Sequence, residues 1–113
     1  MTYELAWLIA FGITQLVEVP IYLALTKIGL GRAFSLSLVT HPIVWFAIAP
    51  LATSAGLSIL PMLVIAELFA WLAEAALLRH FGLAWRRALV ISFVANAASV
   101  LVGELCRAWL GVP

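Results

Sequence analysis

Two glutamates, Glu67 and Glu74, lie seven residues apart in a strongly apolar stretch of the chain. At about 3.6 residues per turn, this spacing returns to nearly the same face of a helix. A charge near the bilayer centre costs about 2.5–3.5 kcal/mol on insertion scales, so intramembrane acids usually face a partner or a water-filled cavity. Residues of this type at this spacing predict binding of a proton or a cation inside a membrane.

Other apolar segments carry polar residues at helical spacing. In the first segment these residues recur at intervals of three and four, and in the last at four and three, so each set forms one stripe along a helix. The predicted residues for binding an ion, a proton or a polar solute are Gln15, Glu18, Tyr22, Ser37, His41, Glu67, Glu74, Ser92, Asn96 and Ser99. Pro20 and Pro42 each remove a helix hydrogen bond, so both are predicted kinks.

The elements that position these residues follow from the composition. The 113 residues are 66% hydrophobic and 10% charged, whereas a soluble domain is about 45–50% apolar. Apolar runs of about 20 residues match the roughly 30 Å hydrocarbon core of a bilayer. We therefore expect an all-α integral membrane bundle, one domain over 1–113, with transmembrane helices at 5–26, 33–53, 58–78 and 88–107.

The two halves of the chain resemble each other. Residues 32–41 align with 87–96, and Arg, Ala, Ser and Val recur in register, with His41 opposite Asn96. With a one-residue gap, Glu18 also falls opposite Glu74. This pattern predicts two tandem helical hairpins, at about 1–56 and 57–113, related as a parallel repeat with a pseudo-twofold axis along the membrane normal.

Basic residues indicate the orientation. Five of the six Lys and Arg flank the first and third loops, namely Lys27, Arg32, Arg79, Arg86 and Arg87. The positive-inside rule places these loops in the cytoplasm and both termini outside. Glu18, His41 and Asn96 each lie nine residues from a basic residue at that side. At about 1.5 Å per residue, this puts them about 13–14 Å deep, close to the midplane.

The pattern Glu18-Val-Pro20, Thr40-His41-Pro42, Glu67, Glu74 and Asn96-Ala-Ala-Ser99 resembles that of a family of small four-helix bacterial membrane proteins. Nearly the whole chain takes part in this resemblance, although the family often has Asn at the position of His41. The resemblance implies a bacterial inner-membrane location and a four-helix fold. It implies no activity, because the family is uncharacterised.

Three functions fit these residues. The first is a channel or proton-coupled transporter for a small cation or polar solute, built as a homo-oligomer, most simply a dimer, in contact with membrane lipids. The second is a non-catalytic subunit of a larger membrane complex, in which the polar side chains fix helix register. The third, weaker, is an intramembrane metalloenzyme with ligands among His41, Glu67 and Glu74, although the spacing matches no known metal motif.

Several other functions find no support in the sequence. The net charge of +1 gives no electrostatic reason to expect nucleic-acid binding. The single cysteine, Cys106, excludes an internal disulfide. Nucleophile elbows, phosphate loops and dinucleotide fingerprints do not occur, so no cofactor is predicted and an enzyme is the less favoured class.

Overall fold

The computed structural model describes residues 1–112, and every regular element within them is helical. The elements are α1 (Tyr3–Leu25), α2 (Leu30–Ile43), η1 (Val44–Ile48), α3 (Ala49–Ser54), α4 (Ile59–His80) and α5 (Trp85–Leu110). Because α2, η1 and α3 follow one another without a gap, they form one span, Leu30–Ser54. This confirms the predicted all-α fold with four helices that are long and apolar enough to cross a membrane.

Most helix ends lie one to three residues from the predicted bounds. The largest difference is in α5, which covers three more residues at each end. Arg86 and Arg87 belong to its first turn, although their charge excluded them from the apolar run. At the other end, Gly111 ends the helix in the left-handed conformation, at φ 67°, which glycine adopts without a steric penalty. Hydropathy marks the apolar core of a span, whereas capping residues decide where the helix stops.

The second span contains a π-helical turn between two prolines. Within this turn the backbone N–H of Ala49 donates to the carbonyl of Val44, five residues earlier. Pro42 and Pro50, which flank the turn, supply no backbone donor. A π turn widens the helix and is a common response to such a defect. The helix distortion predicted at Pro42 thus lies in the turn that follows this residue. At Pro20, in contrast, α1 continues as an α-helix.

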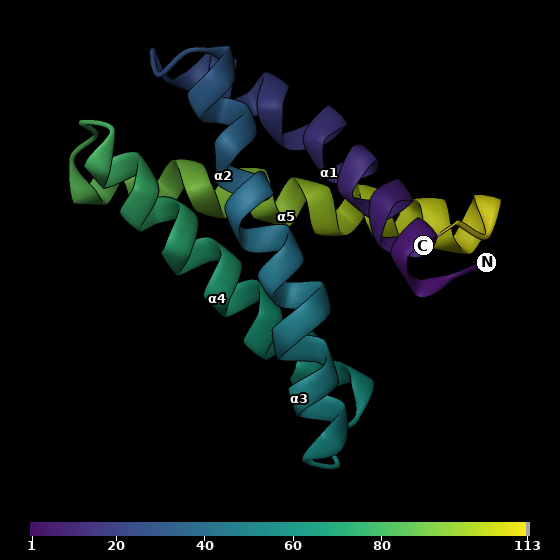
Figure 1. Cartoon of the computed structure of the whole chain (residues 1–113). Coiled ribbons are helices and arrows are strands. Elements are labelled where there is room, and N and C mark those ends of the chain that lie inside the picture. The colour runs from purple at the N-terminus through teal and green to yellow at the C-terminus, as the bar shows by residue number, and fades with distance from the viewer. Residues whose placement is uncertain (113) are drawn as a thin grey trace.

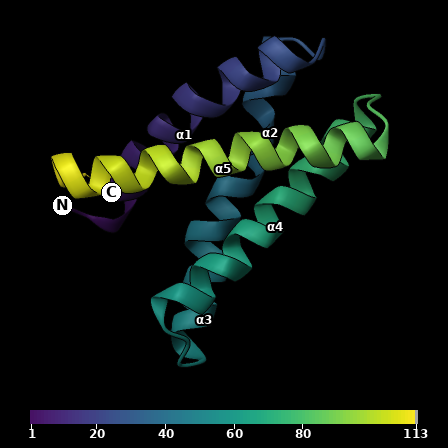
Figure 2. The same ribbon diagram turned by 180° about the vertical axis from the view of Figure 1, so that it is seen from behind.

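The four spans form a wedge (Figures 1 and 2). They gather at the end that carries the loops at 26–29 and 81–84, and they diverge toward the opposite end. One arm consists of α1 and α5 with both termini, and the other consists of α2–η1–α3 and α4. α1 packs on α2 and α5, while α4 packs on α5 and along the whole second span.

The apolar core fills the gathered end of the wedge. Every span contributes to it, for example through Tyr22, Leu36, Leu78 and Ala88, all of which are fully buried. Small side chains allow helices to approach closely where lipid provides no hydrophobic driving force for association. The core therefore closes the molecule at the basic loops and leaves the divergent end unfilled.

Close packing at this core predicts different effects for two alanines of α5. Ala95 is fully buried, whereas Ala97, two residues further along the same helix, is exposed. Ala95→Leu overfills the helix contact and should cost about 1–3 kcal/mol of unfolding free energy, while Ala97→Leu should leave stability unchanged. Thermal unfolding of both variants in detergent tests this. Equal melting temperatures for the two variants would contradict the helix packing described here.

Candidate functional site

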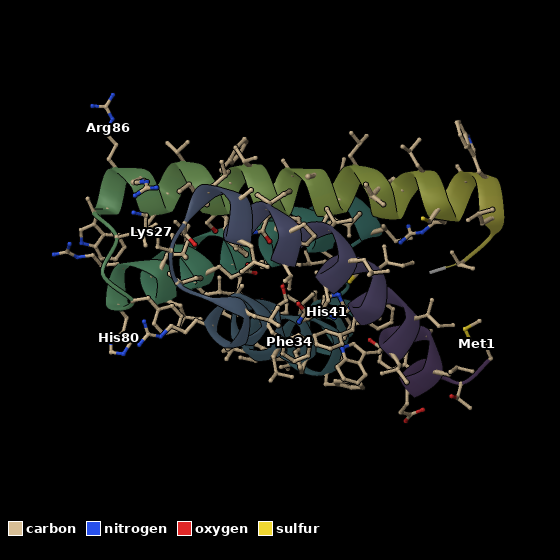
Figure 3. The ribbon with its side chains drawn as sticks, turned by 90° about the horizontal axis from the view of Figure 1, so that it is seen from above. Met1, Lys27, Phe34, His41, His80 and Arg86 are labelled. Carbon is tan, nitrogen blue, oxygen red and sulfur yellow. The ribbon has the colours of Figure 1, made fainter. Side chains whose placement is uncertain are left out.

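A cleft of about 730 Å³ lies between the two arms, and residues from all four spans line it. Its mouth is at the divergent end, near Tyr3, Thr53 and Arg107, and its floor reaches Glu18 and Glu74. Figure 3 shows His41 in the interior beside α1, whereas Lys27, His80 and Arg86 lie at the far, basic edge. A cleft of this volume is in the range of small-molecule sites, about 300–1,000 Å³.

Glu18, in the middle of α1, lies on the floor of the cleft and is only 2% exposed. Its carboxyl oxygens accept hydrogen bonds from two serines. Ser37 of α2 donates to Oε1 at 2.6 Å, and Ser99 of α5 donates to Oε2 at 2.7 Å. A single carboxyl group thus connects α1 to its neighbours in both arms.

Glu74 of α4 is held in the same way and is 1% exposed. The Tyr22 hydroxyl donates to Oε1 at 2.7 Å, and the Thr40 hydroxyl donates to Oε2 at 2.8 Å. Both donors come from the first half of the chain, α1 and α2, while Glu74 belongs to the second. Each of the two glutamates is therefore bound by at least one hydroxyl from the opposite half.

Glu18 and Glu74 are neighbours on the floor of the cleft. Their donors Ser37 and Thr40 lie one turn apart on one face of α2. Two carboxyl groups that share a site repel each other when both are ionised, so a proton on one of them stabilises the pair. The floor of the cleft is thus a hydroxyl-bound carboxyl pair that touches all four spans.

Thr40 was absent from the predicted site residues. Its hydroxyl contacts both Glu74 and the carbonyl of Leu36, at 2.8 and 3.2 Å. The available signal was its position three residues after Ser37, which puts both on one face of the helix. Threonine inside an apolar helix commonly bonds its own backbone, so the sequence did not distinguish a ligand of Glu74 from a local contact.

Glu67 differs from the two floor acids. It lines the cleft two turns before Glu74 on α4, as the spacing of seven predicted, and is partly buried. Among the described residues it receives no side-chain hydrogen bond, whereas Glu18 and Glu74 each receive two. Glu67 therefore has an acceptor group that remains available to an occupant of the cleft.

His41 lines the cleft within a group of aromatic side chains that connects α1 to η1. Its ring stacks on Trp45, with centroids 6.1 Å apart, and lies 5.6 Å from the ring of Phe11. Its Nδ1 atom is buried and has no partner among the described residues. At the mouth, the Tyr3 hydroxyl donates to the Trp45 carbonyl and extends this wall. We call the group the aromatic wall: Tyr3, Trp7, Phe11, His41, Trp45 and Phe46.

The remaining predicted residues take other positions. Asn96 lines the cleft, but its amide donates to the backbone of Ser92 at 2.8 Å. Ser92 in turn donates to the carbonyl of Trp71 at 2.8 Å and joins α5 to α4. Gln15 donates to the carbonyl of Phe34 at 3.0 Å and does not line the cleft. Ser92 and Gln15 thus fix neighbouring helices instead of contributing to the cleft surface.

The described residues contain no group of three or more His, Cys, Asp and Glu side chains arranged to hold a metal ion. His41, Glu67 and Glu74 all line the cleft but do not come together as a ligand set. The metalloenzyme hypothesis therefore has no supporting geometry in this part of the chain.

The chain has no match among protein-family models, curated proteins or solved structures. The role of the cleft is therefore inferred from its residues and shape.

The floor of the cleft predicts unequal effects for two threonines of the second span. Thr40→Val removes a donor to buried Glu74 and should cost about 1–3 kcal/mol, because a buried acceptor loses its partner. Thr53→Val is the matched control, because the Thr53 hydroxyl is exposed and bonds only the Ala49 carbonyl of its own helix. Thermal unfolding in detergent measures both. If the Thr40→Val protein is as stable as Thr53→Val, the hydrogen bond from the Thr40 hydroxyl to Glu74 does not stabilise the fold.

Proposed function

We propose that this protein is a multi-pass membrane transporter that exchanges protons for a small cation or polar solute through its intramembrane carboxyl groups. The observation that carries the proposal is a cleft that is open at one end of the wedge and ends on the Glu18–Glu74 pair. Beyond the pair, the apolar core closes the other end. A site reachable from one side and sealed from the other is what alternating access requires.

The orientation follows from the basic loops. The cleft opens at the end that carries both termini, opposite the loops at 26–29 and 81–84. Since basic loops favour the cytoplasmic side, the cleft in this conformation would face outward. The inward-facing state would need the arms to close at the termini and separate at the core.

The carboxyl pair could couple protonation to this movement. Hydroxyls of one half bind the carboxyl of the other, through Ser99 on Glu18 and Tyr22 and Thr40 on Glu74. Loss of the proton from the pair would leave two like charges in contact and change these bonds. The π turn between Pro42 and Pro50 would be the hinge in the second span, where the helix is already widened.

The predicted parallel repeat is part of this proposal. A pseudo-twofold axis would relate Glu18 to Glu74, and equivalent residues near such an axis meet each other. The position of both acids on the floor of one cleft supports the repeat, and the two hairpins would be the units that rock. Exposed apolar side chains on the outside of both arms, such as Leu16 and Leu60, would contact lipid or a second copy in a homodimer.

Flux through proteoliposomes tests the proposal. Protein reconstituted under a pH gradient or a monovalent-cation gradient should move protons or cations. Glu18→Gln and Glu67→Gln should reduce flux to the level of protein-free vesicles. The amide at position 18 cannot release a proton near neutral pH, and the amide at position 67 removes the carboxylate that is free to pair with a cation. Glu4→Gln is the matched control, since Glu4 is exposed in the first turn of α1 and does not line the cleft.

A folded protein that conducts nothing under either gradient would overturn the transport proposal. The accessory-subunit hypothesis would then be favoured, with the cleft holding a helix of a partner.

The natural cysteine tests the orientation. Cys106 lies four residues before the end of α5 and is partly exposed. In intact spheroplasts, a membrane-impermeant maleimide should label the wild-type protein from outside. A Cys106→Ser, Arg86→Cys variant should be labelled only after permeabilisation, because position 86 lies at the basic end. Labelling in the reverse pattern would place the cleft mouth in the cytoplasm.

A further inference from the structure

The identity of the cleft's occupant can be narrowed from the charges that surround it. At the mouth, Glu104 and Arg107 form a salt bridge of 3.4 Å and neutralise each other. No other Lys or Arg side chain lines the cleft among the described residues, while three acids do: Glu18, Glu67 and Glu74. The electrostatic field inside the cleft therefore favours a cation.

Hydrogen bonds distinguish the three acids from one another. Glu18 and Glu74 each accept hydrogen bonds from two hydroxyls. Glu67 lines the cleft with none of these bonds. A ligand that paired with Glu18 or Glu74 would have to displace hydroxyls that join the helices, whereas pairing with Glu67 displaces none. Glu67 is therefore the carboxylate best placed to be the counter-ion of an occupant.

Away from the floor, the lining of the cleft suits an apolar group better than a bare inorganic ion. Most of the lining surface is apolar, and Tyr3, His41 and Trp45 present part of the aromatic wall. The described residues contain no group of three or more His, Cys, Asp and Glu side chains that could hold a metal ion, and the oxygens on the cleft floor already bond one another. Aromatic rings and apolar surface instead suit a cation that carries its own apolar body.

We propose that the cleft binds a monovalent organic cation of drug-like size, with its charge paired to Glu67 and its apolar body against the aromatic wall. The volume of about 730 Å³ accommodates a molecule of this size. This inference rests on the proposed function and names the substrate class for it. In that scheme Glu67 contacts the substrate, and the Glu18–Glu74 pair on the floor carries the exchanged proton.

Binding of a rigid hydrophobic ion in detergent tests the inference without any requirement for transport. Tetraphenylphosphonium is the probe, and tetraphenylborate is its match in size and shape with the opposite charge. In equilibrium dialysis against protein-free micelles, the cation should bind saturably and the anion should not. Excess Na⁺ at constant ionic strength should not displace the cation.

Variants of Glu67 and Glu4 test which carboxylate pairs with the bound cation. Glu67→Gln should weaken binding of tetraphenylphosphonium about 10- to 100-fold, the effect of losing a charged partner. Glu67→Asp should largely retain binding because the charge is kept, which shows that the fold tolerates change at this position. Glu4→Gln, which alters an exposed acid outside the cleft, should bind like the wild type.

Three results would overturn the inference. Equal binding of both hydrophobic ions would indicate that lipid or detergent fills an apolar cleft without charge selection. Displacement by Na⁺ would indicate a site for an inorganic cation, and unchanged binding in Glu67→Gln would remove Glu67 from the site. Proton flux in proteoliposomes without binding of the organic cation would contradict this inference alone, whereas binding without flux would contradict the proposed transport function and leave the site in place.

Discussion

The structure depends on the contact between two buried carboxyl groups and the four hydroxyls that bind them. An acid inside an apolar bundle is costly unless its oxygens are paired. Glu18 and Glu74 meet this requirement through Ser37, Ser99, Tyr22 and Thr40, which come from α1, α2 and α5. Because each donor must face its acceptor, the hydrogen bonds fix how the spans are rotated about their own axes. The carboxyl groups that join the helices are also groups that can carry a proton.

Glu18 and Glu74 lie at the boundary between the two ends of the wedge, which differ in packing. On one side, small and medium side chains such as Ala75, Ala88 and Leu36 form a closed core. On the other side the arms diverge, and the space between them is a cleft with acids and aromatic rings in its lining. In lipid, helices stay together through close packing and interhelical hydrogen bonds. Close packing and interhelical hydrogen bonds are concentrated at the basic end and around Glu18 and Glu74. Fewer such interactions join the two arms at the opposite end.

The second span makes this separation possible. Its first part, α2, packs on both α1 and α4, whereas η1 and α3 pack mainly on α4. The change of neighbour coincides with the π turn, where two prolines leave the helix without its usual hydrogen bonds. The aromatic wall then joins η1 to the N-terminal end of α1 by side-chain contacts. The two prolines and the π turn of this span thus shape both its arm of the wedge and one wall of the cleft.

The sequence by itself determined the four helical spans, their approximate ranges and the presence of acids inside them, because hydropathy and helical period are local properties. It also predicted that Glu18, Glu67, Glu74 and His41 face a shared interior, since a stripe of polar groups in an apolar helix avoids lipid, and all four line the cleft. Only the tertiary structure decided that Glu18 and Glu74 share the floor of one cleft and that Thr40 binds Glu74. It also left Glu67 without a side-chain hydrogen bond and placed Gln15 and Ser92 on backbone carbonyls elsewhere. Periodicity defines a face of a helix, but the group opposite that face depends on crossing angles and rotations set by side chains far apart in the chain. The cleft itself follows from those angles.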